Sequence, residues 1–170
     1  MKNFPHQYND LRKLRATLET VHALNEAGQD AEDDGVLGYA LARGRVYGFR
    51  GLDYSGTASS VEARVEDRIA DDEKKPTGKQ GARTAAREMR RTLRYLGWLE
   101  DDGTDLTPAG DALLDTAEGS DEEQILMQQA IASIAVADRD GHISHPVQVL
   151  LRLIDEVELD LERARSIRDE

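Results

Sequence analysis

The chain of 170 residues contains no cysteine, only four prolines, and few aromatic residues, which make up 5% of the total. Without cysteine it can form no disulfide, no thiol nucleophile and no Cys-ligated zinc site, and its composition fits a reducing cytoplasm. No run approaches the ~20 apolar residues of a membrane helix, and the N-terminus lacks the hydrophobic region of a signal peptide. We therefore expect a soluble cytoplasmic protein without a membrane partner.

Leucine, alanine and glutamate recur in periodic segments, and β-branched runs are scarce, which favours a mainly helical fold. At this length the chain can bury a core of its own. The spacing of apolar residues predicts helices over 9–27, 36–43, 59–70, 82–95, 108–116, 120–137 and 146–156, and a further amphipathic piece over 159–170. The helix over 120–137 is apolar nearly all round, so we expect it at the centre of the core.

The net charge of −12 argues against a nucleic-acid partner for the chain as a whole. One segment departs from this balance, because residues 73–94 hold eight basic and two acidic side chains and so carry a local charge of +6. The basic residues are Lys74, Lys75, Lys79, Arg83, Arg87, Arg90, Arg91 and Arg94. The positive charge of an acidic protein is thus concentrated in one expected helix and its lead-in.

The expected helix over 82–95 has two stripes. The apolar stripe consists of Ala82, Ala85, Ala86, Met89, Leu93 and Leu96, and the basic stripe of Arg83, Arg87, Arg90 and Arg94, both at helical spacing. Within the helix only Glu88 can pair with these arginines at three- or four-residue steps. The basic stripe is therefore either a DNA-contacting face or a structural face whose partners come from acidic loops elsewhere in the chain.

Gly97 ends this helix, and "GWLEDDGTDLT" predicts a small hairpin around an Asp-Gly turn. Trp98 is expected to pack the hairpin onto the core. Thr107 then caps a helix that has Pro108 at its first position. Further on, Ser120 and Glu123 have the spacing of a capping box.

The run from Ala82 to Leu114, a basic helix followed by a hairpin and "LTPAGDALL", resembles winged-helix DNA-binding domains. The resemblance implies a mainly α fold: a winged helix-turn-helix with a small β-hairpin wing and additional C-terminal helices. In that family the helix before the hairpin enters the major groove, and the wing lies along phosphates. The wing of this chain departs from the basic pattern, because it carries Glu100, Asp101, Asp102 and Asp105.

We expect a winged-helix domain over 1–118 and a helical extension over 119–170, which resembles the start of a second winged-helix unit. The stretch "FPHQYNDLRKLRATLETVHAL" is similar to N-terminal recognition regions of restriction endonucleases. This resemblance implies duplex DNA binding, specific for a sequence or a modification, within a type II-like restriction or DNA-defence enzyme. Two alternatives are a stand-alone transcriptional regulator, dimerised through the helix over 120–137, and a winged-helix protein-interaction module. The expected partners are duplex DNA and either a second copy or a covalently linked nuclease domain.

The predicted DNA-binding residues are Lys75, Lys79, Gln80, Arg83, Arg87, Arg90, Arg91 and Arg94. Arginine suits bidentate contact with guanine and with phosphate, and the N-terminus of the helix favours phosphate near Gln80. We expect no catalytic residue, metal or cofactor in this chain. Glu73 and Lys75 match the Glu-x-Lys half of a metal-dependent nuclease pattern, but they fall in an expected loop rather than on a core strand. His142 and His145 lack a third ligand on a clear helix.

Overall fold

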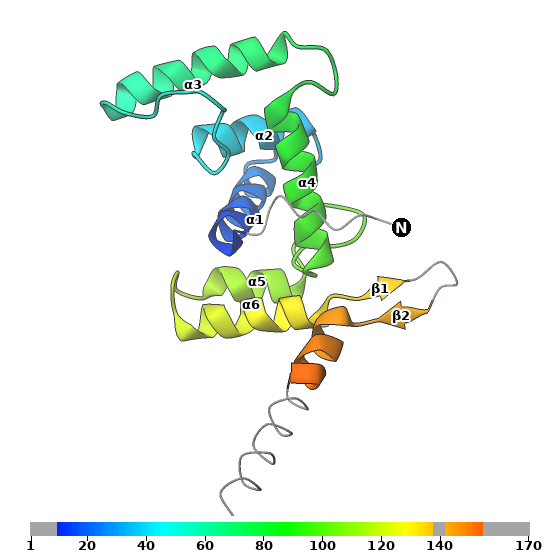
Figure 1. Ribbon diagram of the computed structural model, residues 1–170. Helices are drawn as coiled ribbons and strands as arrows, with labels where there is room; N and C mark the ends of the chain where they lie inside the picture. The colour runs from blue at the N-terminus through cyan, green and yellow to red at the C-terminus, as the bar shows by residue number, and fades with distance from the viewer. Residues whose placement is uncertain (1–9, 138–141, 155–170) are drawn as a thin grey trace, which may run out of the picture.

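The computed structural model describes residues 10–137 and 142–154 and is mainly helical, as predicted (Figure 1). In chain order the labelled helices are α1 (Leu11–Glu26), α2 (Asp34–Arg43), α3 (Ala58–Glu73), α4 (Gly81–Tyr95), α5 (Pro108–Asp115) and α6 (Asp121–Ser133). An antiparallel ribbon of β1 (Val136–Ala137) and β2 (Ile143–Ser144) follows, and then a helix over 146–154. The end of the predicted helix over 146–156 and the piece over 159–170 lie outside the described residues. In the described ranges no helix is long and apolar enough to cross a membrane.

The helices begin where the sequence supplies a side chain that accepts their first N–H groups. Such caps are Asp10, Asp33, Thr57, Thr107 and Ser120. Helix α4 differs, because its N-cap residue Gln80 makes no capping bond. The carboxylate of Asp72, near the end of α3, accepts instead from the N–H groups of Gly81 at 3.2 Å and Ala82 at 3.3 Å. The start of α4 is therefore held by α3.

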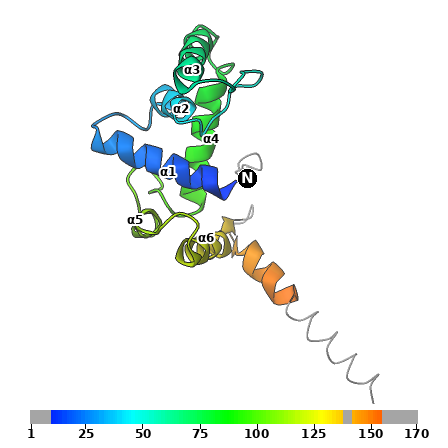
Figure 2. The same cartoon turned by 90° about the vertical axis from the view of Figure 1, so that its left-hand side faces the viewer.

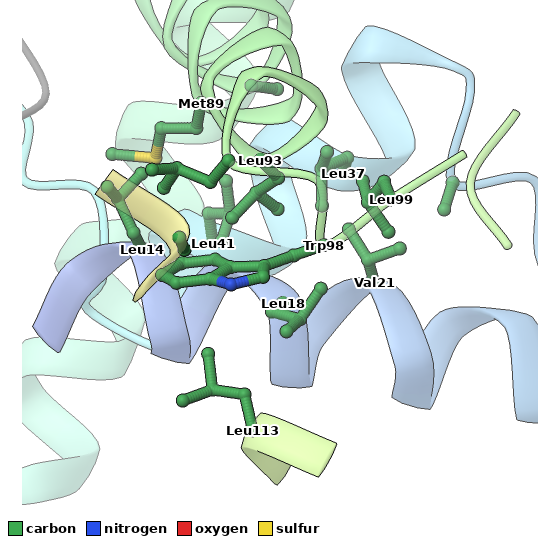
Figure 3. Close-up of a cluster of buried hydrophobic side chains, with 14 of the residues drawn as sticks. Leu14, Leu18, Val21, Leu37, Leu41, Met89, Leu93, Trp98, Leu99 and Leu113 are labelled. Carbon is green, nitrogen blue, oxygen red and sulfur yellow. The ribbon is translucent and has the colours of Figure 1, made fainter. Parts of the chain in front are cut away.

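The main core surrounds the indole of Trp98, which is 1% exposed (Figure 3). Side chains from α1, α2, α4 and α5 converge on it, among them Leu18, Leu37, Leu93 and Leu113. The predicted apolar stripe of α4 is confirmed, since each of its members is buried. The predicted packing of Trp98 onto the core is confirmed as well.

A second, smaller cluster of buried hydrophobic side chains packs α3 against the rest of the molecule. Val61, Val65 and Ile69, which follow the predicted helical spacing, pack with Tyr39 and Phe49. Figure 2 shows α3 above α2, with α5 and α6 on the other side of α1. Helix α3 thus extends the body away from the Trp98 core and brings Asp72 to the start of α4.

Helices α2 and α4 approach each other closely at one glycine. A Cβ at Gly38 would lie 2.5 Å from the carbonyl oxygen of Ala82, which is closer than side-chain carbons tolerate. Ala82 is itself fully buried. A small residue on each helix therefore sets the distance between the two backbones.

The predicted hairpin between α4 and α5 is reduced to a narrow turn over 98–107. Its ladder is one isolated antiparallel bridge, between Leu99 and Leu106. The N–H of Glu100 also donates to Asp105 O at 3.0 Å, and that of Thr107 to Trp98 O at 3.2 Å. The segment is rich in aspartate and glycine, which have low strand propensity, so the pairing does not extend.

The prediction for the helix over 120–137 is wrong in two respects. Helix α6 ends at Ser133, and residues 136–137 form β1 instead of a continued helix. It also lies at the edge of the core, because Glu123, Met127 and Ala130 are its buried residues while Ile125 is 53% exposed. Apolar composition all round did not imply burial all round, because only one face of α6 meets α5 and the main core.

Candidate nucleic-acid interface

Helix α4 brings four of the predicted DNA-binding arginines to one hollow on the surface. The hollow is lined by Arg87, Arg90, Arg91, Arg94, Tyr95 and Asp101. The first five come from α4, and Asp101 comes from the turn over 98–107. The two sides of this hollow are thus the basic helix and the acidic turn that follows it.

Three consecutive acids at the start of α2, Glu32, Asp33 and Asp34, form what we call the acidic segment. Arg90 is bound to this segment and is only 6% exposed. Its guanidinium donates to Ala31 O at 2.9 Å and to Asp34 Oδ1 at 2.8 Å, and its Nε lies 3.4 Å from Glu32 Oε2. Of the two alternatives for the basic stripe, Arg90 therefore fits the structural one, because acids distant in the sequence cover it.

Arg94 joins three parts of the molecule. Its Nη2 donates to Gly103 O at 2.7 Å and its Nε to the same oxygen at 3.2 Å, while Nη2 also pairs with Glu32. The carbonyl of Gly103 belongs to the tip of the turn over 98–107. Arg94 consequently fixes the turn against α4 and leaves only 24% of its side chain exposed.

Arg83 lies against the start of α2. A Cβ at Gly35 would come within 2.6 Å of the Arg83 Nη2, so the guanidinium covers the backbone there. The neighbouring carboxyl of Asp33 accepts from the N–H groups of Val36 and Gly35. These two bonds lower the pKa of Asp33, and the charges of Arg83 and Arg90 lower it further. The charges of Arg83 and Arg90 thus help to stabilise the charged form of Asp33.

Arg87 and Arg91 are the arginines of this hollow that solvent reaches best. The Arg87 side chain is 54% exposed, and its nearest carboxylate oxygens lie at 3.6 Å on Asp34 and 3.9 Å on Glu88. The Arg91 side chain is 34% exposed, lies 3.7 Å from Glu88 and stacks 5.8 Å above the ring of Tyr95. Exposed ion pairs at such distances contribute little, so both guanidinium groups can exchange a carboxylate for a phosphate.

The lead-in to α4 differs from the expectation. Lys75 Nζ donates to the buried Asp72 at 2.7 Å, and Gln80 is 8% exposed and donates to Glu73 O at 3.2 Å. Asp72 also accepts the first two N–H groups of α4, so they are not open to a phosphate. Lys79 is exposed. It is the predicted lead-in residue that solvent reaches freely.

A buried ion pair that the sequence analysis missed connects α1 to α6. Arg15 Nη1 lies 2.7 Å from Glu123 Oε1, both residues are 6% exposed, and Arg15 also donates to Thr116 O at 2.8 Å. Burial raises the pKa of Glu123, but the N–H of Gly119 and the charge of Arg15 outweigh it and leave that pKa below its ordinary value. The sequence contained one signal of this ion pair, because Arg15 falls within the apolar stripe of α1.

The predicted capping box of Ser120 and Glu123 forms only in part. Ser120 accepts from Glu123 N at 3.1 Å, but the Glu123 carboxylate accepts from Gly119 N rather than from Ser120 N.

Across residues 10–137 and 142–154, no three His, Asp or Glu side chains are grouped as a metal site. Of the nuclease-like pattern, Glu73 is the last residue of α3, and Lys75 follows the C-cap of that helix. Comparison with known proteins gives no match to a family model, a curated protein or a solved structure. The likeness to winged-helix domains and to restriction endonucleases therefore stays a prediction.

Proposed function

We propose that this chain binds duplex DNA through the exposed arginines of α4, Arg87 and Arg91, assisted by Lys79. The observation that carries the proposal is the gathering of four guanidinium groups at one hollow beside α4. Arginine recognises phosphate and guanine edges with two parallel hydrogen bonds, and an exposed guanidinium can do so without leaving a buried acid unpaired.

In the proposed complex with DNA, the chain is arranged as a winged helix, and the hollow faces the duplex. In the proposal, α4 is the helix that enters the major groove, and the turn over 98–107 takes the position of a short wing. The close packing of α2 on α4 at Gly38, and of α5 directly after the turn, supports this arrangement. Arg90 and Arg94 are then positioning residues, which hold α4 to the acidic segment and to Gly103.

The setting we propose is the recognition portion of a cytoplasmic restriction or other DNA-defence endonuclease. It rests on the likeness of the N-terminal sequence and of the helix–hairpin–helix run to such proteins. The catalytic domain would then be covalently linked and distinct from the residues described here.

The test is a fluorescence-anisotropy titration of the protein with random duplex DNA at several salt concentrations. We expect binding that weakens with salt at a log–log slope of about −3, because three side chains neutralise phosphates. The double variant Arg87→Ala, Arg91→Ala should lose binding. Its matched control is Arg12→Ala, Lys13→Ala, which removes the same charge from exposed positions on α1.

Two outcomes would contradict the proposal. If the wild type binds neither random duplex DNA nor duplex DNA with modified bases, even at low salt, the chain is not a DNA-binding protein. If both double variants lose affinity equally, binding follows overall charge rather than the α4 hollow. Circular dichroism of each variant establishes that the fold is retained.

One observation favours a second candidate, a protein-interaction module for an acidic partner. The arginines of α4 already bind carboxylates of this chain, namely those of Glu32 and Asp34. An acidic peptide offers the same groups. Binding of a poly-glutamate peptide, together with no binding of duplex DNA, would support this function instead.

A further inference from the structure

Glu88 is the one acidic residue of α4, and it lies beside the two exposed arginines of that helix. Its Oε1 is 3.9 Å from Arg87 Nε, and its Oε2 is 3.7 Å from Arg91 Nη1. The side chain is 30% exposed. Both distances exceed those of hydrogen bonds, so each carboxylate oxygen can still accept a hydrogen bond from a donor outside the chain.

Glu88 belongs to a row of polar side chains that runs along α4 beside the basic stripe. The members follow one another at steps of four, three and four residues, which places them on one side of the helix, and each is partly exposed. They are Thr84, Glu88, Arg91 and Tyr95. The row thus presents a hydroxyl, a carboxylate, a guanidinium and a phenol. Phosphate contacts need donors, whereas the edges of the bases present donors as well as acceptors.

A carboxylate at this position opposes the binding of phosphate. Its charge repels the DNA backbone, and it attracts the guanidinium groups of Arg87 and Arg91 that would otherwise be open to phosphate. The fold gains little from it in return, because ion pairs of this length at exposed positions contribute little to stability. The Glu88 carboxylate is therefore better suited to a hydrogen-bond donor on the ligand than to either of these roles.

The chemistry of the base edges indicates which donor fits. In the major groove, cytosine presents its N4 amino group as a donor. Adenine presents its amino group beside the acceptor N7, guanine presents two acceptors, and thymine presents an acceptor and a methyl group. An acceptor repels a carboxylate, so cytosine is the base that a glutamate can contact without repulsion. The neighbouring Arg91 has the donors that the O6 and N7 atoms of guanine accept.

We propose that Glu88 is the specificity-determining residue of the α4 site and accepts a hydrogen bond from N4 of a cytosine, so that the site reads a C·G base pair. The inference rests on the proposed binding of duplex DNA through Arg87 and Arg91. Arg91 donates to the guanine of the same or the adjacent base pair, and Arg87 holds the helix to the backbone.

Selection from a pool of duplexes with a randomised central window tests this proposal. We expect the wild type to enrich duplexes with a fixed cytosine, and replacement of that C·G pair should lower the affinity about tenfold. Glu88→Ala should lose the preference for cytosine, and Glu88→Gln should shift it towards adenine, which glutamine contacts with two hydrogen bonds. The matched control is Glu62→Ala, which removes the same charge from an exposed position on α3 and should keep the wild-type preference.

The affinity for unselected duplexes distinguishes base contact from mere positioning of the arginines. Glu88→Ala should bind random duplex DNA at least as tightly as the wild type, because a negative charge is removed from the DNA-facing side of α4. Weaker binding would mean that the carboxylate only positions Arg91, and would overturn the proposal.

Two results of the selection would also overturn it. One is a wild-type selection without a preferred cytosine, and the other is a preference that Glu88→Ala leaves unchanged. The proposed function survives both results if Arg87→Ala, Arg91→Ala still abolishes binding. Failure of the wild type to bind any duplex in the pool would instead overturn the proposed function, and this inference with it.

Discussion

At the scale of single residues, the arginines of α4 divide into two groups by their partners. Arg90 and Arg94 bind main-chain oxygens and the acidic segment at hydrogen-bond distance, and little of either side chain is exposed. Arg87 and Arg91 make longer ion pairs and face solvent. The same residue type thus stabilises the fold at one position and is available to a ligand at the next, and only tertiary contacts distinguish the two.

This division predicts different costs for two equal substitutions. Arg90→Ala removes the partner of Asp34 and of Ala31 O, so we expect it to lower the free energy of unfolding by about 2–3 kcal/mol. Arg87→Ala should change it by less than about 0.5 kcal/mol, because its ion pairs are exposed. Urea titration of both variants measures the difference, and equal stabilities would contradict the assignment of Arg90 as a positioning residue.

At the scale of elements, the contact between α2 and α4 depends on the absence of one side chain. A methyl group at Gly38 would meet the main chain of Ala82 rather than a movable side chain. We expect Gly38→Ala to destabilise the protein by about 1–3 kcal/mol, the usual cost of overpacking. Thermal unfolding of the variant measures it.

Gly44→Ala is the control for this prediction. Gly44 ends the same helix with a φ of −71°, and an added Cβ would lie 3.4 Å from its nearest neighbour, Ala40 O. We expect no loss of stability there, or a small gain. A larger loss at Gly44 than at Gly38 would mean that helix geometry, not the approach of α4, decides the effect.

The helices could be predicted because the signals that define them lie within or next to each helix in the sequence. For each of the helices α1 to α5, the predicted ends lie within three residues of the observed ends. This agreement follows because apolar spacing and capping residues such as Asp33 and Thr107 can be recognised in the sequence itself. Helix α6 was placed wrongly because exposure of Ile125 depends on which neighbours exist, not on the composition of the helix. The ribbon of β1 and β2 was missed because strands of two residues leave no alternating pattern.

The sequence predicted that the arginines of α4 lie close together, but it did not predict which of them are exposed. Helical spacing placed Arg87, Arg90 and Arg94 on one side of α4, and the hollow brings them together. The burial of Arg90 could not be predicted, because its partners Ala31 and Asp34 lie more than fifty residues away along the chain. The lack of acids on the helix was the available signal that partners had to come from elsewhere.

At the scale of the whole molecule, the ion pair of Arg15 and Glu123 joins the first described helix to the last one of the main core. Residues on both sides of the predicted boundary at 118 are therefore fastened directly to each other. Met127 and Ala130 of α6 also belong to the Trp98 core. The predicted extension over 119–170 thus begins with a helix that shares the core of the preceding residues.

This ion pair predicts how stability depends on pH. The pKa of Glu123 is lowered from 4.5 in the folded chain, so the carboxylate contributes stability that is complete above pH 4.5. That contribution is lost as the pH falls below 4.5 through the folded pKa. Glu123→Gln should lower the free energy of unfolding at neutral pH by about 3 kcal/mol, because Arg15 loses its buried carboxylate partner and keeps only the half-exposed Glu19.

The same substitution should also flatten the acid side of the stability profile. Denaturant titrations at a series of pH values check both effects, with Glu122→Gln as the control because Glu122 is exposed on the same turn. An unchanged pH profile in Glu123→Gln would show that other carboxyl groups dominate acid unfolding.

Trp98 is the sole tryptophan of the chain, and it lies at the point where α1, α2, α4 and α5 meet. The protein therefore contains a built-in optical probe with a single origin for its signal. Its emission should be that of an indole shielded from water, and it should shift to longer wavelength when the core opens. Because Trp98 also begins the turn over 98–107, the same fluorescence can follow unfolding of the core without any attached label.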